Sequence, residues 1–289
     1  MAKLPLDLVE AILERMGFSA HPTLDLAGLS ELYAAWCQSV PTDNCCKLIA
    51  LRSDGNAPLP GAEASDFFET WLKHGVGGTC WALHGAWFEL LSVLGFNARR
   101  AISTMMVAPN LPPNHGSVIV EMNGRSYWVD GGIKYLKPLA IIPGRNEWIA
   151  HPAWGVQGHW LDDIYAIRWR ALHLDDPFDC HLNEWPVDAG KFALQHEATR
   201  EWSPFNYELN FAIVKGEERI GVGMGKAVRV MSDGTMVRSP LEDRVGYLVD
   251  TLGVSEELAH KVPDDVPTPP PPWSRKARNS ATRPKGMLP

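Results

Sequence analysis

Long apolar runs are absent from this sequence of 289 residues, and cysteine is scarce. No stretch approaches the roughly 20 apolar residues that a membrane-spanning helix needs, so we expect no membrane association. The N-terminal segment carries acidic residues and lacks the apolar stretch and cleavage site of a signal peptide. The five cysteines are odd in number, and Cys45 and Cys46 are adjacent. We therefore expect free thiols in a reducing cytoplasm rather than a disulfide framework.

Excess basic charge and several familiar motifs are also missing. The formal net charge is -7, which argues against a general nucleic-acid binder. No P-loop and no G-x-S-x-G motif is present. The histidines near Cys180 match none of the zinc spacings, so no metal site is expected; they are His151, His159, His173 and His181.

What is present predicts a globular α+β chain of several parts. Residues 1–95 show mostly helical spacing, and residues 96–195 contain short β-type runs between turn residues. Residues 196–262 mix both patterns, with a hairpin turning at Asp233-Gly234 and helical spacing from about 240. Residues 263–289 are rich in proline and carry a basic cluster, so we expect a disordered tail.

One cysteine stands at a position that favours reactivity. Cys80 follows Gly77-Gly78-Thr79 and opens a predicted helix that ends at Gly95. The apolar stripe of this predicted helix consists of Leu83, Trp87, Leu90, Leu91 and Leu94. We expect Thr79 to cap this helix, and unpaired N–H groups in its first turn favour a thiolate. The competing interpretation is a buried core cysteine, since free cysteines are among the most buried residues.

A predicted hairpin places a base and a carboxylate together. Asn123-Gly124 between two β-type runs favours a two-residue type I′ turn, which pairs Met122 with Arg125. In that register Asp130 shares a face with His115, as a diagonal neighbour within side-chain reach. Cys80, His115 and Asp130 then form a nucleophile, a base and the carboxylate that orients it.

A second histidine is a rival for the role of base. His84 lies four residues after Cys80 on the same helix face. It has no obvious carboxylate partner in the sequence, and its neighbours on the stripe are apolar. His115 is therefore the preferred base.

These segments resemble the arylamine N-acetyltransferase family. The resemblance rests on "GGTCWALHGAWFELLSVLGF", "NHGSVIVEM" and "YWVDGG", with weaker matches at "VPTDN" and "SPFNYELNFAIV". It covers about residues 5–260. It implies an N-terminal helical bundle, a central β-barrel and a C-terminal α/β lid, with a Cys-His-Asp triad at the junction of the first two. The implied reaction is ping-pong transfer of an acetyl group from acetyl-CoA to an arylamine or arylhydrazine nitrogen.

The chain departs from the family pattern beside the triad. Val76 stands where the family usually has arginine, and Thr79 and Ile133 stand where it has aromatic residues. Trp81-Ala82 follows the cysteine in place of Phe-Glu. Lys134 is also new; beside Gly131 and Gly132 it is a candidate contact for CoA phosphate. The departures leave the triad intact and bear on the shape of the acceptor pocket.

The sequence thus predicts a cytoplasmic N-acetyltransferase that uses acetyl-CoA, a small-molecule amine and no metal. One alternative keeps the fold but takes the acyl group from a carrier-protein thioester, as related amide synthases of macrolactam formation do. Further alternatives are a hydrolytic or transglutaminase-like thiol enzyme and a non-catalytic homologue. No nucleic-acid or membrane partner is expected.

Overall fold

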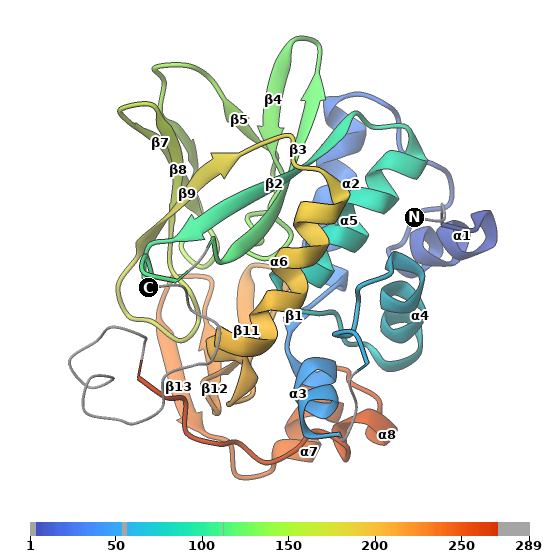
Figure 1. Cartoon of the computed structure of the whole chain (residues 1–289), viewed down its shortest axis with the longest axis vertical. Coiled ribbons are helices and arrows are strands. Elements are labelled where there is room, and N and C mark those ends of the chain that lie inside the picture. Colours follow the sequence, from blue (N-terminus) through green and yellow to red (C-terminus); the bar gives the residue numbers. More distant parts are fainter. Residues whose placement is uncertain (1–3, 54–56, 112, 271–289) are drawn as a thin grey trace.

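The structure, a computed structural model, describes residues 4–53, 57–111 and 113–270. Helices make up most of the first part, an eight-stranded sheet the middle, and a five-stranded sheet with short helices the last part (Figure 1). The α+β class predicted from the sequence is confirmed. Among the described residues, no helix has the length and apolar character to cross a membrane.

The first part contains five helices among the described residues: α1 (Leu6–Arg15), α2 (Leu26–Ser39), α3 (Cys45–Arg52), α4 (Ala64–His74) and α5 (Cys80–Leu94). These helices confirm the mostly helical spacing that the sequence shows over residues 1–95. The stripe predicted for α5 is buried throughout, and the helix ends at Gly95, whose φ of 99° is left-handed. Thr79 takes the N-cap position but makes no side-chain capping bond, so the capping prediction is wrong.

The middle sheet is a nearly closed barrel. Its strands are β2 (Ala98–Met105), β3 (His115–Met122), β4 (Arg125–Trp128), β5 (Leu139–Ile141), β6 (Glu147–Ile149), β7 (Val156–Leu161), β8 (Ile164–Trp169) and β9 (Phe178–Glu184). They follow the order β5-β4-β3-β2-β9-β8-β7-β6. The end strands β5 and β6 contact each other, which brings the two edges of the sheet together.

The β3–β4 hairpin has the predicted register. Met122 pairs with Arg125 and Ile119 with Trp128. Asn123 (φ 51°) and Gly124 (φ 73°) both have positive φ, as a type I′ turn requires. This turn fixes which residues of β3 face the same side as Asp130, two residues beyond β4.

The last sheet has the order β1-β10-β11-β12-β13 and recruits its first strand from the helical part. Its strands are β1 (Thr42–Asp43), β10 (Phe211–Lys215), β11 (Glu218–Gly223), β12 (Lys226–Val230) and β13 (Met236–Pro240). The predicted turn at Asp233-Gly234 joins β12 to β13. The predicted helix from about 240 begins later, because Pro240 still belongs to β13; α7 (Arg244–Gly246), a π-helix (Tyr247–Thr251) and α8 (Glu256–Ala259) follow.

Helix α6 (Ala189–Trp202) crosses the predicted boundary between residues 195 and 196. Asp188 caps it by accepting a hydrogen bond from the Lys191 N–H. It packs against α5 and β2. The rings of Phe192 and Trp81 meet edge-to-face, with their centroids 5.0 Å apart. The chain therefore does not divide at this point. A short 3-10 turn, η1 (Pro204–Asn206), follows α6 and leads to the last sheet.

The start of the predicted disordered tail packs against the last part of the chain. The Asp265 carboxylate accepts a hydrogen bond from the Leu209 N–H, and the Val266 N–H donates to the Tyr207 carbonyl. Residues 263–270 thus have no helix or strand but are held by polar contacts. Residues 271–289, which hold most of the proline-rich and basic stretch, lie outside the described residues.

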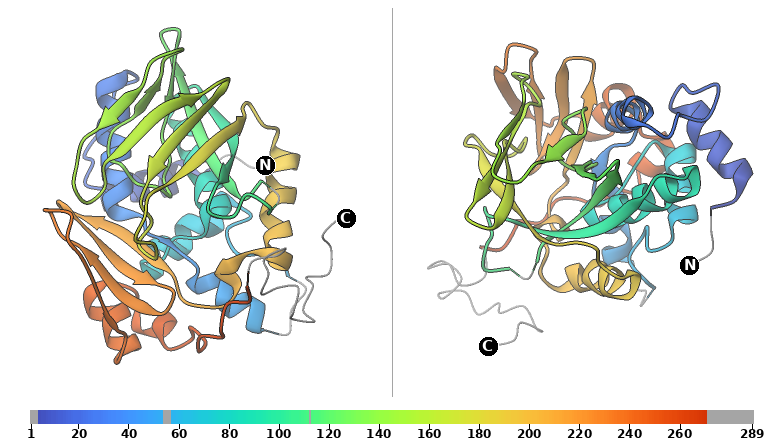
Figure 2. Two further views of the ribbon diagram at one scale, coloured as in Figure 1. Left: turned by 90° about the vertical axis from the view of Figure 1, so that its left-hand side faces the viewer. Right: turned by 90° about the horizontal axis from the view of Figure 1, so that it is seen from above.

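Among the described residues, two large apolar cores and two smaller clusters hold the molecule together. The largest core joins α1, α2, α4 and α5 to the barrel strands. It contains Trp36 and Trp87, whose ring centroids lie 4.5 Å apart. The other large core lies beneath the last sheet and includes Phe211 and Leu248. Figure 2 shows the barrel strands lying beside the last sheet, with helices packed next to both. Helix α5 packs against β2 and β3 of the barrel, and Gly78, just before it, bridges to Thr42 of β1 in the last sheet.

Candidate active site

Cys80 opens α5 directly after a tight turn that contains Gly77 and Gly78. A Cβ atom on Gly77 would lie 2.0 Å from the Pro41 carbonyl oxygen, so this residue cannot carry a side chain. The Gly77 N–H donates to the Asp43 carboxylate at 2.6 Å, and Gly78 bridges to Thr42 of β1. These contacts set the start of α5 against the last sheet. Cys80 is half-buried in its first turn.

His115 and Asp130 meet as the hairpin register predicts. The His115 Nε2–H donates to Asp130 Oδ2 at 2.7 Å, and both side chains are buried. Asp130 also accepts from the Ser117 hydroxyl at 2.6 Å and from the N–H groups of Gly132 and Ile133 at 3.0 and 2.8 Å. The carboxylate is therefore surrounded by donors.

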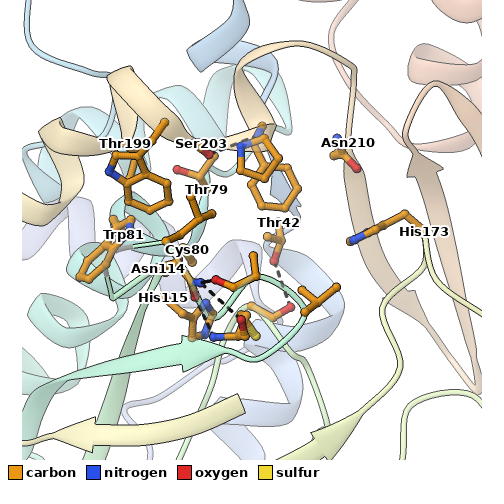
Figure 3. A pocket seen from close by; sticks show the side chains of 18 of the residues that line it. Thr42, Thr79, Cys80, Trp81, Asn114, His115, His173, Thr199, Ser203 and Asn210 are labelled. Carbon is orange, nitrogen blue, oxygen red and sulfur yellow. Dashed lines mark hydrogen bonds between the residues drawn. The ribbon is translucent and has the colours of Figure 1, made fainter. Parts of the chain in front are cut away.

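The electrostatics of the pair favour a charged imidazole. Burial alone would keep Asp130 protonated, but the His115 and His84 imidazoles hold the pKa of its carboxyl well below the usual range. Burial likewise favours neutral His115, yet Asp130 and Cys80 outweigh it and raise the pKa of His115 to about 10. With Nε2 bound to Asp130, Nδ1 is the nitrogen left for Cys80 (Figure 3). This arrangement suits a thiolate beside an imidazolium.

His84 shares the same carboxylate, which sequence reasoning missed. Its Nδ1–H donates to the Cys80 carbonyl at 2.7 Å, and its Nε2 lies 3.3 Å from Asp130 Oδ1. Burial lowers the pKa of His84, although the carboxylate opposes the shift. The expectation that His84 lacks a carboxylate partner is therefore wrong. His84 connects the backbone of Cys80 to Asp130, whereas His115 connects to its side chain.

His84, His115 and Asp130 also form a group that could hold a metal ion. One ligand atom from each lies within 4.8 Å of the others. Hydrogen bonds already engage His84 Nδ1, His115 Nε2 and both carboxylate oxygens. A metal at these atoms would have to break the His115–Asp130 contact. The absence of a metal stays a prediction.

A cavity of about 150 Å³ opens above Cys80 and His115 (Figure 3). Most of its wall is apolar and comes from distant parts of the chain; its aromatic members are Trp81, Trp169, Phe178, Trp202 and Phe205. Its polar lining includes Lys47 of α3, Thr199 of α6 and Asn210. Trp81 is the residue among them that the sequence links to the acceptor pocket, because it follows Cys80. Sequence reasoning singled out none of the others, which lie far from the triad in sequence and share no motif with it.

The three residues predicted to contact CoA have different surroundings. Lys134 is fully buried and its Nζ donates to the Val40 carbonyl, so it presents no surface to a phosphate; this part of the prediction is wrong. Gly131 is packed so tightly that a Cβ would lie 2.5 Å from Trp36 Nε1. Gly132 lines the cavity, and its contact with CoA stays a prediction.

The chain has distant sequence relatives among known proteins. No protein-family model matches the chain. It is 26% identical over 141 residues to proansamycin X synthase of Amycolatopsis mediterranei, a match covering 47% of this chain and 53% of that protein. It therefore spans about half the length of this relative. It is 24% identical over 226 residues to an arylamine N-acetyltransferase of Mycolicibacterium smegmatis, covering 72% and 76%.

Solved structures match a larger share of the chain than these sequence relatives do. The arylamine N-acetyltransferase of Mycobacterium marinum matches with a TM-score of 0.73 and 18% identity, covering 89% of this chain and 95% of that one. The Mycobacterium abscessus enzyme matches with a TM-score of 0.72 and 13% identity, covering 88% and 93%. A further match is the M. marinum enzyme in complex with CoA, at a TM-score of 0.72 and 18% identity. The chain has the fold of the arylamine N-acetyltransferases and resembles them in sequence.

Proposed function

We propose that this chain is an acyltransferase of the arylamine N-acetyltransferase type. It takes an acetyl group from acetyl-CoA onto Cys80 and passes it to the nitrogen of an arylamine or similar amine. The observation that carries the proposal is the position of His115, bound through Nε2 to Asp130 and adjacent to Cys80 on its other side. The match to a CoA-bound M. marinum enzyme supports acetyl-CoA as the donor.

In the first half-reaction the Cys80 thiolate attacks the carbonyl carbon of the thioester. A carbon–sulfur bond forms to Cys80, the bond to the CoA sulfur breaks, and the His115 imidazolium supplies the proton that CoA retains. The developing oxyanion needs donors, and the N–H of Cys80 is one, because first-turn N–H groups have no intrahelical partner. Asp130 keeps the imidazole oriented through both charge states.

In the second half-reaction an amine nitrogen attacks the Cys80 thioester. Neutral His115 accepts the proton that the nitrogen loses, and the Cys80 thiolate leaves. Apolar walls around the cavity favour a flat aromatic body over water near the thioester, so that aminolysis is faster than hydrolysis. The aromatic walls therefore support an arylamine acceptor.

Intact-mass spectrometry tests this function. Acetyl-CoA without an acceptor should add about 42 Da to the protein, one acetyl group in a covalent intermediate. Peptide mapping should place the adduct on Cys80, and adding an arylamine should remove it with formation of an N-acetyl product. A Cys80→Ala variant that still acquires the adduct would contradict the proposal.

A second candidate is an amide synthase that takes its acyl group from a carrier protein. The partial match to proansamycin X synthase favours it. The same mass measurement separates the two candidates. An adduct formed from a carrier-protein thioester, and from none of a panel of acyl-CoA thioesters, would establish the second. Both rest on Cys80 as the nucleophile.

A further inference from the structure

A lysine without an acidic partner lines the cavity beside Cys80. Lys47 lies on α3 and is 5% exposed. Its Nζ donates to the Thr199 hydroxyl at 2.9 Å and to the Thr199 carbonyl at 3.4 Å. Both acceptors are neutral, and both belong to one residue of α6. A buried ammonium normally requires an anion to offset the loss of hydration.

No carboxylate forms an ion pair with Lys47 in the part of the chain that the structure describes; Glu197 acts on its ammonium from a distance, and less than Cys80 does. The lysines in ion pairs there are Lys73, Lys191 and Lys261, all on the surface. Asp43, the acidic residue that lines the same cavity, accepts hydrogen bonds from the N–H groups of Cys45 and Gly77. Lys47 is thus the strongly basic side chain of an otherwise mostly apolar wall.

The remainder of the wall indicates what an anion there would be attached to. Trp81, Trp202 and Phe205 are among its aromatic members, and aromatic faces pack well against aromatic ligands. Thr199, which holds Lys47, lies across the cavity from His115 in Figure 3, with Cys80 between them. A ring placed between these ends would present one substituent to Cys80 and another to Lys47.

We propose that Lys47 binds the carboxylate of an aromatic acceptor, so that the preferred substrate class is aminobenzoates rather than uncharged arylamines. The inference rests on the proposed function and adds the substrate class. The carboxylate replaces the neutral Thr199 oxygens as the partner of the ammonium, and the amino group on the same ring reaches the acylated Cys80. Lys47 is then a specificity-determining residue that acts through contact with the substrate.

The protonation behaviour of Lys47 agrees with this role. Burial lowers the pKa of its ammonium to about 7, and Cys80 is the group that most opposes the shift. A bound carboxylate would favour the charged form further, because an opposite charge at contact distance raises the pKa of a lysine. Binding of the anion and protonation of Lys47 therefore reinforce each other.

The test compares 4-aminobenzoate with its methyl ester as acceptors for the acetylated enzyme. The wild type should prefer the acid by about tenfold or more in kcat/KM, as expected for one charge-assisted contact. Lys47→Met should remove that preference while keeping turnover of the ester. Lys226→Met, at an exposed position on β12, is the matched control and should leave the preference unchanged.

Three results would overturn the proposal. The wild type could show no preference for the acid, or Lys47→Met could slow both acceptors equally, which would mean that Lys47 acts on Cys80. A preference confined to the donor, for succinyl-CoA over butyryl-CoA, would place the carboxylate in the acyl group instead.

A binding measurement keeps this test separate from the proposed function. Benzoate should protect Cys80 from iodoacetamide in the wild type, and methyl benzoate should protect it less. The difference should vanish in Lys47→Met. This assay requires no acyl transfer, so it can succeed even if the enzyme acetylates nothing. If acetyl transfer occurs but benzoate gives no more protection than its ester, only the Lys47 inference fails.

Discussion

The two sides of the Cys80 cavity hold buried charge in opposite ways. On the barrel side, Asp130 is fully buried and meets His115, His84, Ser117 and two backbone N–H groups. On the α3 side, Lys47 is almost as deeply buried but meets only the neutral oxygens of Thr199. The first charge is fully compensated within the protein, and the second is not.

This difference matches the proposed roles: His115 and Asp130 must stay in place for proton transfer, whereas Lys47 must bind an anion of the substrate. The hydrogen bonds to Asp130 hold His115 in one orientation, as proton transfer to and from a thiol requires. An ammonium with a neutral partner retains most of its attraction for an anion. Compensation of buried charge, more than burial itself, therefore distinguishes the proposed catalytic residues from the proposed binding residue.

Removing the base should have the largest effect. His115→Ala should lower acyl transfer by about 10³-fold or more, since a general acid–base group contributes about 10² to 10⁴ and here also stabilises the thiolate. Lys47→Met should leave transfer to uncharged acceptors largely intact. Steady-state kinetics with an uncharged arylamine measures both. Equal losses in the two variants would erase the distinction between the two sides.

Stability should also differ between the sides. Asp130→Asn should destabilise the fold by about 3–5 kcal/mol, because it leaves buried histidines without their counter-charge. Lys47→Met should be neutral or stabilising by up to about 2 kcal/mol, since it removes an uncompensated buried charge. Urea unfolding of each variant gives these values. A larger loss for Lys47→Met than for Asp130→Asn would contradict the comparison.

The His115–Asp130 pair should make stability depend on pH. The pKa of His115 is raised from 6.5 to about 10 in the folded state, so its contribution is fully present below pH 6.5. That contribution is lost as the pH rises from 6.5 towards 10. The wild type should therefore lose more unfolding free energy across this range than His115→Gln does. Parallel pH profiles for the two proteins would show that the imidazole is not charged in the folded state.

His84 should matter less than His115. His84→Ala should reduce acyl transfer by about tenfold, because it removes a hydrogen bond to the Cys80 carbonyl and one contact to Asp130 but leaves the His115 pair. Acyl-transfer rates of His84→Ala and His115→Ala, measured side by side, show which histidine acts as the base. A greater loss in His84→Ala would make His84 the base.

The hairpin turn should give the smallest effect. Gly124→Ala places a side chain at a φ of 73° with nothing within 4 Å of the new methyl group. The cost should be about 1 kcal/mol of backbone strain, without a change in kcat for the folded enzyme. Thermal unfolding and kinetics at low temperature measure the two quantities. A loss of kcat would mean that the turn does more than set the register of β3 and β4.

The sequence predicts the placement of Cys80, His115 and Asp130 well, because that placement depends on short-range rules. Asn123-Gly124 fixes the hairpin register, and the register places Asp130 beside His115. The start of α5 at Cys80 follows from the glycines before it and from the apolar stripe after it. Turn chemistry and periodicity act over a few residues, so they can be recognised without the fold.

The parts that the sequence does not predict depend on contacts across the fold. His84 meets Asp130 only because α5 packs against the barrel, and Lys47 reaches the cavity only because α3 and α6 meet there. The sequence predicts Lys134 as a contact for CoA phosphate, but tertiary packing buries it, and its Nζ donates to the Val40 carbonyl. Such long-range contacts have no sequence signal of their own.

Site-resolved alkylation tests the central claim most directly, namely that His115 and Asp130 make Cys80 the reactive thiol. Iodoacetamide at neutral pH should label Cys80 well before Cys46, which is also half-buried but whose pKa is raised to about 12 by burial. In His115→Ala the labelling of Cys80 should slow markedly. Labelling that begins at Cys46, or a Cys80 rate that does not change without the imidazole, would contradict the account.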